Sequence, residues 1–544
     1  MGWGIGVFPA PIAYFPVEKR NKEDIMEKFS YQKQIPLQSG ERFWGGSVGQ
    51  GIRMPIREDK NYKHTCVDGC QGNSFNGIFT SNYGRYIVTE GAYSIEVENG
   101  VITLSSTEEI TVGQAEEKTL KGGYLAAAKL ACKFDEVDVP ADLLLKPQFC
   151  TWAEMGIGVH QEQVLSYARS IVEKDLAHSL FIIDDGWMVD YGDWRFNEEK
   201  FPNPKAMFDE LNALGFKTYL WLVPFVNKDV PDYELLVKND ALVRGQDGKP
   251  TLKKWWNGDS YVLDMTCPFA QNWLKTQLDR YVNEYGVYGF KFDAGDTDYY
   301  NYTDVTYQPT TPAGQCLLWS EFAAQYAYSE LRATFRLGGS HVITRLSDKQ
   351  RNWSDECGIG TLVPNMIQAG LCCYPYSCAD MIGGGVISDF ETDDHERKAD
   401  EFNVELISRF CECSALMPCM QFSYAYWNRD ERIEKLFQKY ASSRLDIEAY
   451  MKALIAEAKH TFAPILRHLE YEFPHQGYKD DMSAFMLGSE YLVAPVVCEG
   501  QTQKTLRLPE GASWRYEVDG RVFNGGESVT VDCPVGTLPY FKKI

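Results

Sequence analysis

Histidine is scarce in this chain, basic charge is in the minority, and no long apolar run occurs. With 8 His among 544 residues, and with no matching second pair for Cys66 and Cys70, we expect neither a metal site nor a cofactor. Lys and Arg number 54 against 76 Asp and Glu, a formal charge of −22, which disfavours nucleic acid and anionic membranes as partners. No segment is apolar enough over the length needed to span a bilayer.

Cysteine pairing is not expected either. The 15 Cys are odd in number and scattered, and Cys372 and Cys373 are adjacent, which fits free thiols better than a disulfide framework. The first residues are apolar but lack a basic leader, and Pro9, Pro11 and Pro16 interrupt them, so we expect no signal peptide. We therefore predict a cytoplasmic protein.

The length of the chain predicts about three domains. Residues 1–145 contain short alternating apolar runs separated by turn residues, which predict an N-terminal β-sandwich. Residues 146–443 alternate strand-like runs with amphipathic helices, as in a (β/α)8 barrel. Residues 444–544 predict a helical connection and a C-terminal β-sheet domain. The expected fold class is thus α/β, a TIM barrel between two β-domains.

Seven segments are candidates for barrel strands: 149–152, 178–184, 217–224, 288–293, 341–345, 371–374 and 417–422. In such a barrel the chemistry lies where the strands end. The side chains at or just after those ends are mostly acids and aromatics: Trp152, Asp184, Asp185, Trp221, Asp293, Arg345 and Asp380. Hydrolysis of a glycosidic bond needs such a pocket, with one carboxylate to attack the sugar and another to donate a proton.

The segment 288–296, YGFKFDAGD, is the most informative of these. Asp293 closes an apolar strand, and Lys291 lies two residues earlier on the same face. A carboxylate beside an ammonium stays ionised at neutral pH, as an attacking nucleophile must. The alternative is that Asp293 caps a helix and Lys291 is solvated.

Short motifs in a constant order along nearly the whole chain resemble glycoside hydrolase family 31. The chain is most similar to the branch that contains the myogenesis-regulating glycosidase and bacterial α-galactosidases. The motifs are 43–46 (FWGG), 183–185 (IDD), 200–203 (KFPN), 221–227 (WLVPFVN), 255–258 (WWNG), 290–295 (FKFDAG), 345–346 (RL), 379–384 (ADMIGG), 417–423 (MPCMQFS) and 492–495 (LVAP).

The resemblance implies that Asp293 is the nucleophile of a retaining, double-displacement mechanism on α-linked sugars. The family places its acid/base Asp at a spacing that, counted from Trp353 and from Arg345, leads to Glu356. Asp355, immediately before it, is the alternative. A Glu at this position is a departure from the family pattern and leaves room for weak or lost activity.

The resemblance also implies a set of substrate-binding residues. Carboxylates and cations would contact sugar hydroxyls, and aromatic rings would wall the site; helix caps, ion pairs and core packing are the alternatives. The hydroxyl-binding candidates are Asp184, Asp185, Lys291, Arg345 and Asp380. The aromatic candidates are Trp255 and Trp256 for the wall, with Trp152, Trp221 and Trp44.

We therefore expect an exo-acting, retaining, metal-free α-glycosidase whose partner is a small glycoside or an oligosaccharide. The resemblance favours α-galactosides, while α-glucosidase, α-N-acetylgalactosaminidase and sulfoquinovosidase activities stay open. A sulfoquinovosidase would need a cationic pocket, and the sequence has no extra basic cluster for it. A sugar-binding protein that has lost the chemistry is the alternative from another class. The sequence leaves the oligomeric state open, a homo-oligomer included.

Overall fold

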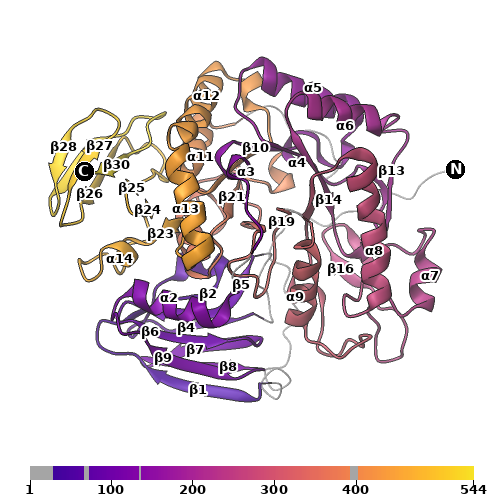
Figure 1. Cartoon of the computed structure of the whole chain (residues 1–544), viewed down its shortest axis with the longest axis horizontal. Helices are drawn as coiled ribbons and strands as arrows, with labels where there is room; N and C mark the ends of the chain where they lie inside the picture. Colours follow the sequence, from indigo (N-terminus) through magenta and orange to yellow (C-terminus); the bar gives the residue numbers. More distant parts are fainter. Residues whose placement is uncertain (1–28, 67–72, 134–135, 327, 392–401) are drawn as a thin grey trace.

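A closed parallel barrel lies at the centre of the computed structural model, which describes residues 29–66, 73–133, 136–326, 328–391 and 402–544 (Figure 1). This confirms the TIM barrel. Its strands follow one another in chain order: β10 (Gln148–Cys150), β11 (Leu180–Ile183), β14 (Lys217–Leu222), β18 (Gly289–Phe292), β19 (Glu330–Leu331), β20 (Ile343–Arg345), β21 (Ser377–Met381) and β22 (Cys419–Phe422).

Helices surround the barrel (Figure 1). The sequence dictates their ends: Asn203 caps α6 by accepting from the backbone N–H of Ala206, Pro204 occupies its first turn, and Gly215 follows with a positive φ of 95°. The helices are α4 (Trp152–Met155), α5 (Gln161–Glu173), α6 (Pro204–Ala213), α7 (Tyr233–Lys238), α8 (Pro268–Arg280), α9 (Pro312–Ala323), α10 (Leu362–Leu371), α11 (Val404–Ser414) and α12 (Glu431–Asp446).

Two of the barrel strands differ from the sequence prediction. The segment 371–374 is not a strand; it ends α10, where Cys373 adopts a left-handed φ of 69°. Because α10 is buried on nearly all sides, the short apolar run at its end cannot be distinguished by sequence from a buried strand. The strand at this position is β21, a few residues later. The remaining strand, β19, is absent from the prediction because two residues carry no alternating pattern.

Two antiparallel sheets precede the barrel, and the ring of Phe79 meets that of Tyr93 edge to face across them. They form the expected N-terminal β-domain, followed by α2 (Leu120–Ala131) and α3 (Ala141–Leu145). One sheet contains β1 (Tyr31–Pro36), β8 (Val101–Ser106), β7 (Tyr93–Glu98) and β4 (Tyr62–Thr65). The other contains β3 (Ile56–Arg57), β2 (Arg42–Ser47), β5 (Phe75–Ser81), β6 (Arg85–Thr89) and β9 (Ile110–Gln114).

The C-terminal β-domain packs around its own core, in which Trp514 is fully buried. Helix α13 (Glu448–Thr461) lies between the barrel and these strands (Figure 1), and α14 (Leu469–Glu472) follows. The strands are β23 (Leu466–Arg467), β24 (Phe485–Leu487), β25 (Tyr491–Val493), β26 (Gln503–Arg507), β27 (Ser513–Tyr516), β28 (Val522–Asn524), β29 (Ser528–Asp532) and β30 (Tyr540–Lys543). The domain boundaries given above stay a prediction.

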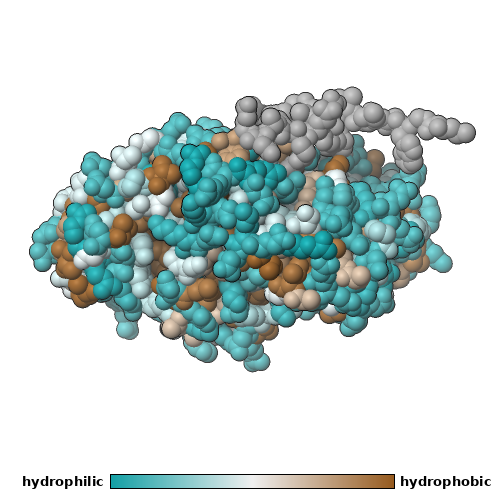
Figure 2. Space-filling view, turned by 90° about the horizontal axis from the view of Figure 1, so that it is seen from above, coloured by the Kyte–Doolittle hydropathy of each residue, from teal (hydrophilic) through white to brown (hydrophobic). Residues whose placement is uncertain are grey.

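Short β-insertions after β11 and β14 form one side of the barrel rim. A hairpin follows β11, with strands β12 (Met188–Asp190) and β13 (Asp193–Phe196). A small sheet follows β14, made of β15 (Phe225–Val226), β16 (Lys253–Trp255) and β17 (Gly258–Val262). The face seen in Figure 2 is mainly hydrophilic, with scattered apolar groups. In the described part of the chain, no helix has the length and apolarity to cross a membrane.

Candidate active site

Asp293 follows β18 directly and lies at the carboxyl end of the barrel with 9% of its surface exposed. Its Oδ2 accepts a hydrogen bond from Trp221 Nε1 at 2.9 Å, and its Oδ1 accepts one from the backbone N–H of Ala294 at 2.9 Å. Arg332 Nε forms an ion pair with the same Oδ1 at 2.9 Å. The carboxylate is therefore oriented on both oxygens by rigid donors.

The charges around Asp293 keep it ionised. Burial alone would raise its pKa, but the charges of Arg332, Lys291 and Arg345, together with the hydrogen bond from Trp221, lower the pKa to about 2. The group is thus a carboxylate throughout the neutral range. A nucleophile at a sugar carbon needs this protonation state.

Arg332 is a central residue of the site that the sequence prediction does not contain. It follows the two-residue strand β19, donates to Asp296 Oδ2 at 2.6 Å, and places its guanidinium 4.9 Å from the ring centre of Trp256. Burial would lower its pKa, but the charges of Asp296 and Asp293 raise the pKa above the usual range. Arg332 thereby joins the nucleophile candidate to the aromatic wall. The sequence does not reveal it because the two-residue strand before it, β19, has no recognisable strand pattern.

Lys291 has a different direct partner from the one predicted. Its Nζ forms an ion pair with Asp184 Oδ2 at 2.6 Å, and the thiol of Cys150 donates to that oxygen at 3.0 Å. The expectation that Lys291 is the direct neighbour of Asp293 is therefore corrected: Lys291 acts on it at longer range. Inside a barrel, side chains from alternate strands share a layer, and β11 and β18 are alternate strands, so Lys291 meets Asp184.

Asp185, the next residue, accepts hydrogen bonds from neutral groups, whereas Asp184 is paired with the ammonium of Lys291. Its Oδ2 accepts hydrogen bonds from the hydroxyl of Tyr191 at 3.0 Å and from Asn257 Nδ2 at 3.0 Å. Burial first, and then the charge of Asp184, raise the pKa of Asp185 to about 7. Both of these partners are neutral, and the carboxyl group is only 1% exposed.

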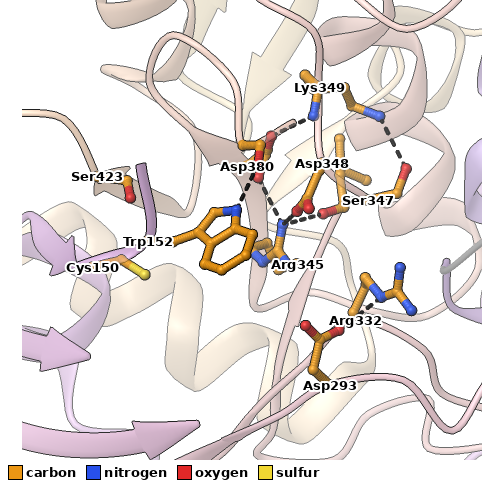
Figure 3. A network of polar contacts seen from close by, with 12 residues as sticks. Cys150, Trp152, Asp293, Arg332, Arg345, Ser347, Asp348, Lys349, Asp380 and Ser423 are labelled. Carbon is orange, nitrogen blue, oxygen red and sulfur yellow. Dashed lines mark hydrogen bonds and ion pairs between the residues drawn. The ribbon is translucent and has the colours of Figure 1, made fainter. Parts of the chain in front are cut away.

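A second cluster forms around Arg345, shown with Asp293 and Arg332 in Figure 3. Arg345 Nη1 lies 2.7 Å from Asp380 Oδ1 and 2.6 Å from Asp348 Oδ1, and its Nε lies 3.0 Å from Glu330 Oε1. Asp380 adopts a φ of 87°, a conformation that Asp tolerates better than most residues. Burial raises the pKa of Asp380 to about 6, against the opposing charge of Arg345.

The three acids of the loop after β20 differ in their surroundings. Asp355 and Glu356 are exposed, and in the described part of the chain no hydrogen bond or ion pair involves their side chains. Asp348, which the sequence prediction does not contain, keeps 29% of its side-chain surface exposed while it is bound to the buried Arg345. It is the acid of this loop that the structure brings to the carboxylate cluster.

Aromatic rings line the side of the rim next to Arg332. Trp255 donates to Ser260 Oγ at 2.9 Å, and its ring stacks on Phe225 with 4.3 Å between centroids. Trp256 is partly exposed and meets Trp255 edge to face at 5.0 Å. Trp255 is therefore mainly a support, whereas Trp256 presents surface to solvent.

The other two aromatic candidates have different positions. Trp152 opens α4, stays partly exposed, and donates to the carbonyl of Gly385 at 2.7 Å beside Arg345 (Figure 3). Trp44 is fully buried on β2, with its ring 5.1 Å from that of His468. Among the contacts of the described residues, none joins Trp44 to the barrel-end carboxylates, so the structure does not bring it to this site.

The composition of the site defines a class of protein. It combines a fixed, ionised carboxylate, a second and more accessible carboxylate, and partly exposed aromatic rings at the carboxyl end of a (β/α)8 barrel, as glycosidases do. Among the residues that the structure describes, no group of three or more His, Cys, Asp and Glu side chains is arranged to hold a metal ion.

Comparison with known proteins gives the family. Residues 145–454 match the TIM-barrel domain of glycosyl hydrolases family 31, and residues 462–543 match the C-terminal domain of that family. The chain is 33% identical to the myogenesis-regulating glycosidase of Mus musculus, over 96% of this chain and 79% of that protein. The chain therefore belongs to glycoside hydrolase family 31, and it is a glycosidase by class.

More distant relatives vary in the substrate that they are named for. The chain is 26% identical to a sulfoquinovosidase of Escherichia coli, over 64% of this chain and 53% of that protein. A solved structure of a Flavobacterium johnsoniae dextranase complexed with glucose superimposes with a TM-score of 0.81 at 20% identity, over 95% of this chain and 67% of that one. At this identity the structural match speaks for the fold alone.

Proposed function

We propose that this protein is a retaining, exo-acting α-glycosidase with Asp293 as its nucleophile. The observation that carries the proposal is the environment of Asp293, which is ionised, oriented by Trp221 and paired with Arg332 at the end of β18. Membership of family 31 supports the α-linked substrate. The similarity to the mouse myogenesis-regulating glycosidase and the motif at 255–258 favour α-galactosides over other α-glycosides.

We propose Asp348 as the acid/base, in place of Glu356 and its alternative Asp355. One oxygen of Asp348 faces Arg345, and its Oδ2 accepts no hydrogen bond from the described residues, so this oxygen is open to a glycosidic oxygen. The charge of Asp348 also acts on Arg332, the partner of the nucleophile. Within the part of the chain that the structure describes, the exposed side chains of Asp355 and Glu356 have no comparable link.

The two carboxylates divide the reaction into two balanced steps. In the first, an Asp293 oxygen bonds to C1 of the sugar, the bond from C1 to the glycosidic oxygen breaks, and Asp348 gives its proton to the departing oxygen. In the second, a water oxygen attacks C1, Asp348 takes a proton from that water, and the bond from C1 to Asp293 breaks. Two inversions at C1 leave the released sugar in its original α configuration.

The surrounding polar groups fit the binding of sugar hydroxyls. Asp184 with Lys291, and Asp380 with Arg345, offer charged acceptors and donors near Asp293, whose pKa the charges of Lys291 and Arg345 both lower. Trp256 and Trp152 provide partly exposed rings for the faces of the sugar. A sulfonate would need a further cation, since Lys291, Arg332 and Arg345 each already face a carboxylate.

A substrate panel tests the proposal. Aryl α-galactoside, α-glucoside, α-N-acetylgalactosaminide and α-sulfoquinovoside are incubated with the protein, and proton NMR follows the first anomer released. We expect fastest turnover of the α-galactoside, with α-galactose as the first product. Release of the β anomer contradicts retention. A protein that hydrolyses no substrate, yet melts at a higher temperature with a sugar bound, is a non-catalytic relative.

Single substitutions test the acid/base assignment. Asp348→Ala is expected to lower kcat/KM by about 10²- to 10⁴-fold for a poor leaving group, and much less for an activated aryl group that departs without a proton. Added azide should restore turnover and yield a glycosyl azide. Asp355→Ala and Glu356→Ala are matched controls on the same loop, expected to stay near wild type. If either control instead shows the azide rescue, the acid/base is that residue.

A further inference from the structure

The N-terminal β-domain reaches the loop that carries Asp348 through one buried amide. Asn73 lies just before β5 and is 4% exposed. Its Oδ1 accepts a hydrogen bond from the backbone N–H of Ser347 at 3.1 Å, and its Nδ2 donates to Ser347 Oγ at 3.1 Å. Two bonds from one planar amide to one residue fix both the position and the direction of that residue.

Ser347 lies between anchors that come from the barrel itself. On one side, the N–H of Leu346 donates to the carbonyl of Cys378 at 2.9 Å; on the other, the N–H of Lys349 donates to Asp380 Oδ2 at 2.7 Å. Lys349 Nζ also contacts Ser347 Oγ at 3.4 Å (Figure 3). Asn73 thus supplies a contact from outside the barrel at the residue next to Asp348.

The amide of Asn73 has little room to move. A Cβ at Gly49, in the short helix η1 (Val48–Arg53), would lie 2.8 Å from Asn73 Nδ2. A Cβ at Gly51, in the same helix, would lie 2.3 Å from the carbonyl oxygen of Pro364 in α10. Helix η1 is therefore in close contact with the barrel on one side and with Asn73 on the other. This close packing allows Asn73 to transmit a fixed position from one domain to the other.

We propose that Asn73 is a positioning residue for proton transfer, acting through Ser347 on Asp348. The inference rests on the proposed role of Asp348 as acid/base. A general acid must lie within about 3 Å of the atom that it protonates, and a misplacement of about 1 Å can cost on the order of a hundredfold in rate. Among the described residues the side chain of Asp348 has one firm partner, Arg345, so its reach depends on where the loop backbone lies.

The leaving group separates this role from simple structural support. Asn73→Ala is expected to lower kcat/KM about 10- to 100-fold for a glycoside with a poor leaving group, while an activated aryl glycoside should lose less than about threefold because it departs without the proton. Ser347→Ala removes one of the two bonds and is expected to give a smaller shift in the same direction. If Asn73→Ala folds poorly, Ser347→Ala takes its place as the test of the positioning role.

Asn76 provides the matched control. It is a buried Asn on the same domain, three residues away, and its Nδ2 donates to the carbonyl of Cys372 in the barrel at 3.3 Å. Asn76→Ala therefore removes a comparable link between the same domains at a place away from Asp348. We expect it to change the rates for both leaving groups by the same factor.

Asp348→Ala is measured on the same two substrates. Failure of the positioning role of Asn73 can then be distinguished from failure of the acid/base assignment. If Asp348→Ala shows the leaving-group dependence while Asn73→Ala and Ser347→Ala slow both substrates equally, as Asn76→Ala does, the positioning role is overturned and the acid/base assignment stands. If Asp348→Ala lacks the dependence, both are overturned. Leaving-group dependence in Asp348→Ala, Asn73→Ala and Ser347→Ala, but not in Asn76→Ala, supports both.

Discussion

Asp293 and Asp348, which we propose as the nucleophile and the acid/base, are held in different ways. Asp293 follows a barrel strand, is 9% exposed, and has donors on both oxygens. Asp348 lies in a loop, keeps 29% of its side-chain surface exposed, and is bound on one oxygen by Arg345. The first group is surrounded by fixed charge, whereas the second is accessible to water and to a leaving group.

This difference matches the two roles. A nucleophile must stay ionised and pointed at one carbon, so a strand end and a depressed pKa suit it. An acid/base must gain and lose a proton in each cycle, so it needs an open oxygen and contact with solvent. The substitutions at Asp293 and Arg332 test whether the two sides are as distinct as their surroundings indicate.

The largest effect is expected at Asp293 itself. Asp293→Ala removes the atom that bonds to C1, so kcat should fall by more than about a thousandfold for every leaving group, as for the loss of a covalent nucleophile elsewhere. Mass spectrometry after treatment with a 2-deoxy-2-fluoro glycoside or a cyclitol epoxide should find the label on the peptide containing Asp293. A label on another peptide would show that the nucleophile lies elsewhere.

A smaller effect is expected at Arg332, which distinguishes the nucleophile side from the acid/base side. Arg332→Lys keeps the charge but cannot reach Asp293, Asp296 and the Trp256 ring together. Loss of these contacts should lower kcat/KM about tenfold to a hundredfold, to a similar extent for poor and activated leaving groups. Steady-state kinetics on the two substrates measure this.

The control for Arg332 is an exposed pair of the same type. Arg57 Nε lies 2.7 Å from Asp59 Oδ1 at the surface of the N-terminal domain. Exposed ion pairs contribute little, so Arg57→Lys should match the wild type within about twofold. A leaving-group dependence in Arg332→Lys would mean that Arg332 serves the acid/base, and the proposed division between the two sides would fail.

The two sides also differ in what their sequence reveals. Asp293 can be predicted because an apolar strand pattern ends in an acid, and that pattern belongs to the segment itself. Arg332 cannot be predicted, since β19 has two residues and leaves no pattern. Asp348 is obscured because the spacing from Trp353 leads to Glu356, and only the tertiary contact with Arg345 separates the three acids of the loop.

The same limit applies to burial. The barrel and its β-domains follow from the change in periodicity along the chain, which is a local property. Whether an aromatic ring lines a site or fills a core depends on domain packing: Trp44 is buried against His468, whereas Trp256 stays partly exposed over Arg332. Nothing in the residues next to either Trp encodes that difference.

The smallest effect is expected at Asp185, and it concerns stability. This carboxyl group has a folded-state pKa of about 7, above the value of about 4 for an exposed Asp in the unfolded chain. Between these two values the folded state holds a proton that the unfolded state has lost. The contribution of Asp185 to stability is therefore full below pH 4 and is lost as the pH rises through 7.

Asp185→Asn isolates this contribution, because an amide has nearly the shape of a protonated carboxyl group and does not ionise. At pH 5, about one unit above the unfolded-state pKa, part of the contribution is already lost, so the variant should melt slightly higher than the wild type. At pH 8.5 the variant should melt a few degrees higher, since one kcal/mol corresponds to about 2–4 °C in a domain of 150–250 residues. Differential scanning fluorimetry at both pH values gives the comparison, and all groups that titrate alike in the two proteins cancel. A difference in melting temperature that is the same at pH 5 and pH 8.5 would mean that Asp185 is ionised in the folded protein, held by its bonds to Tyr191 and Asn257 in the same way that Asp293 is held by Trp221 and Arg332.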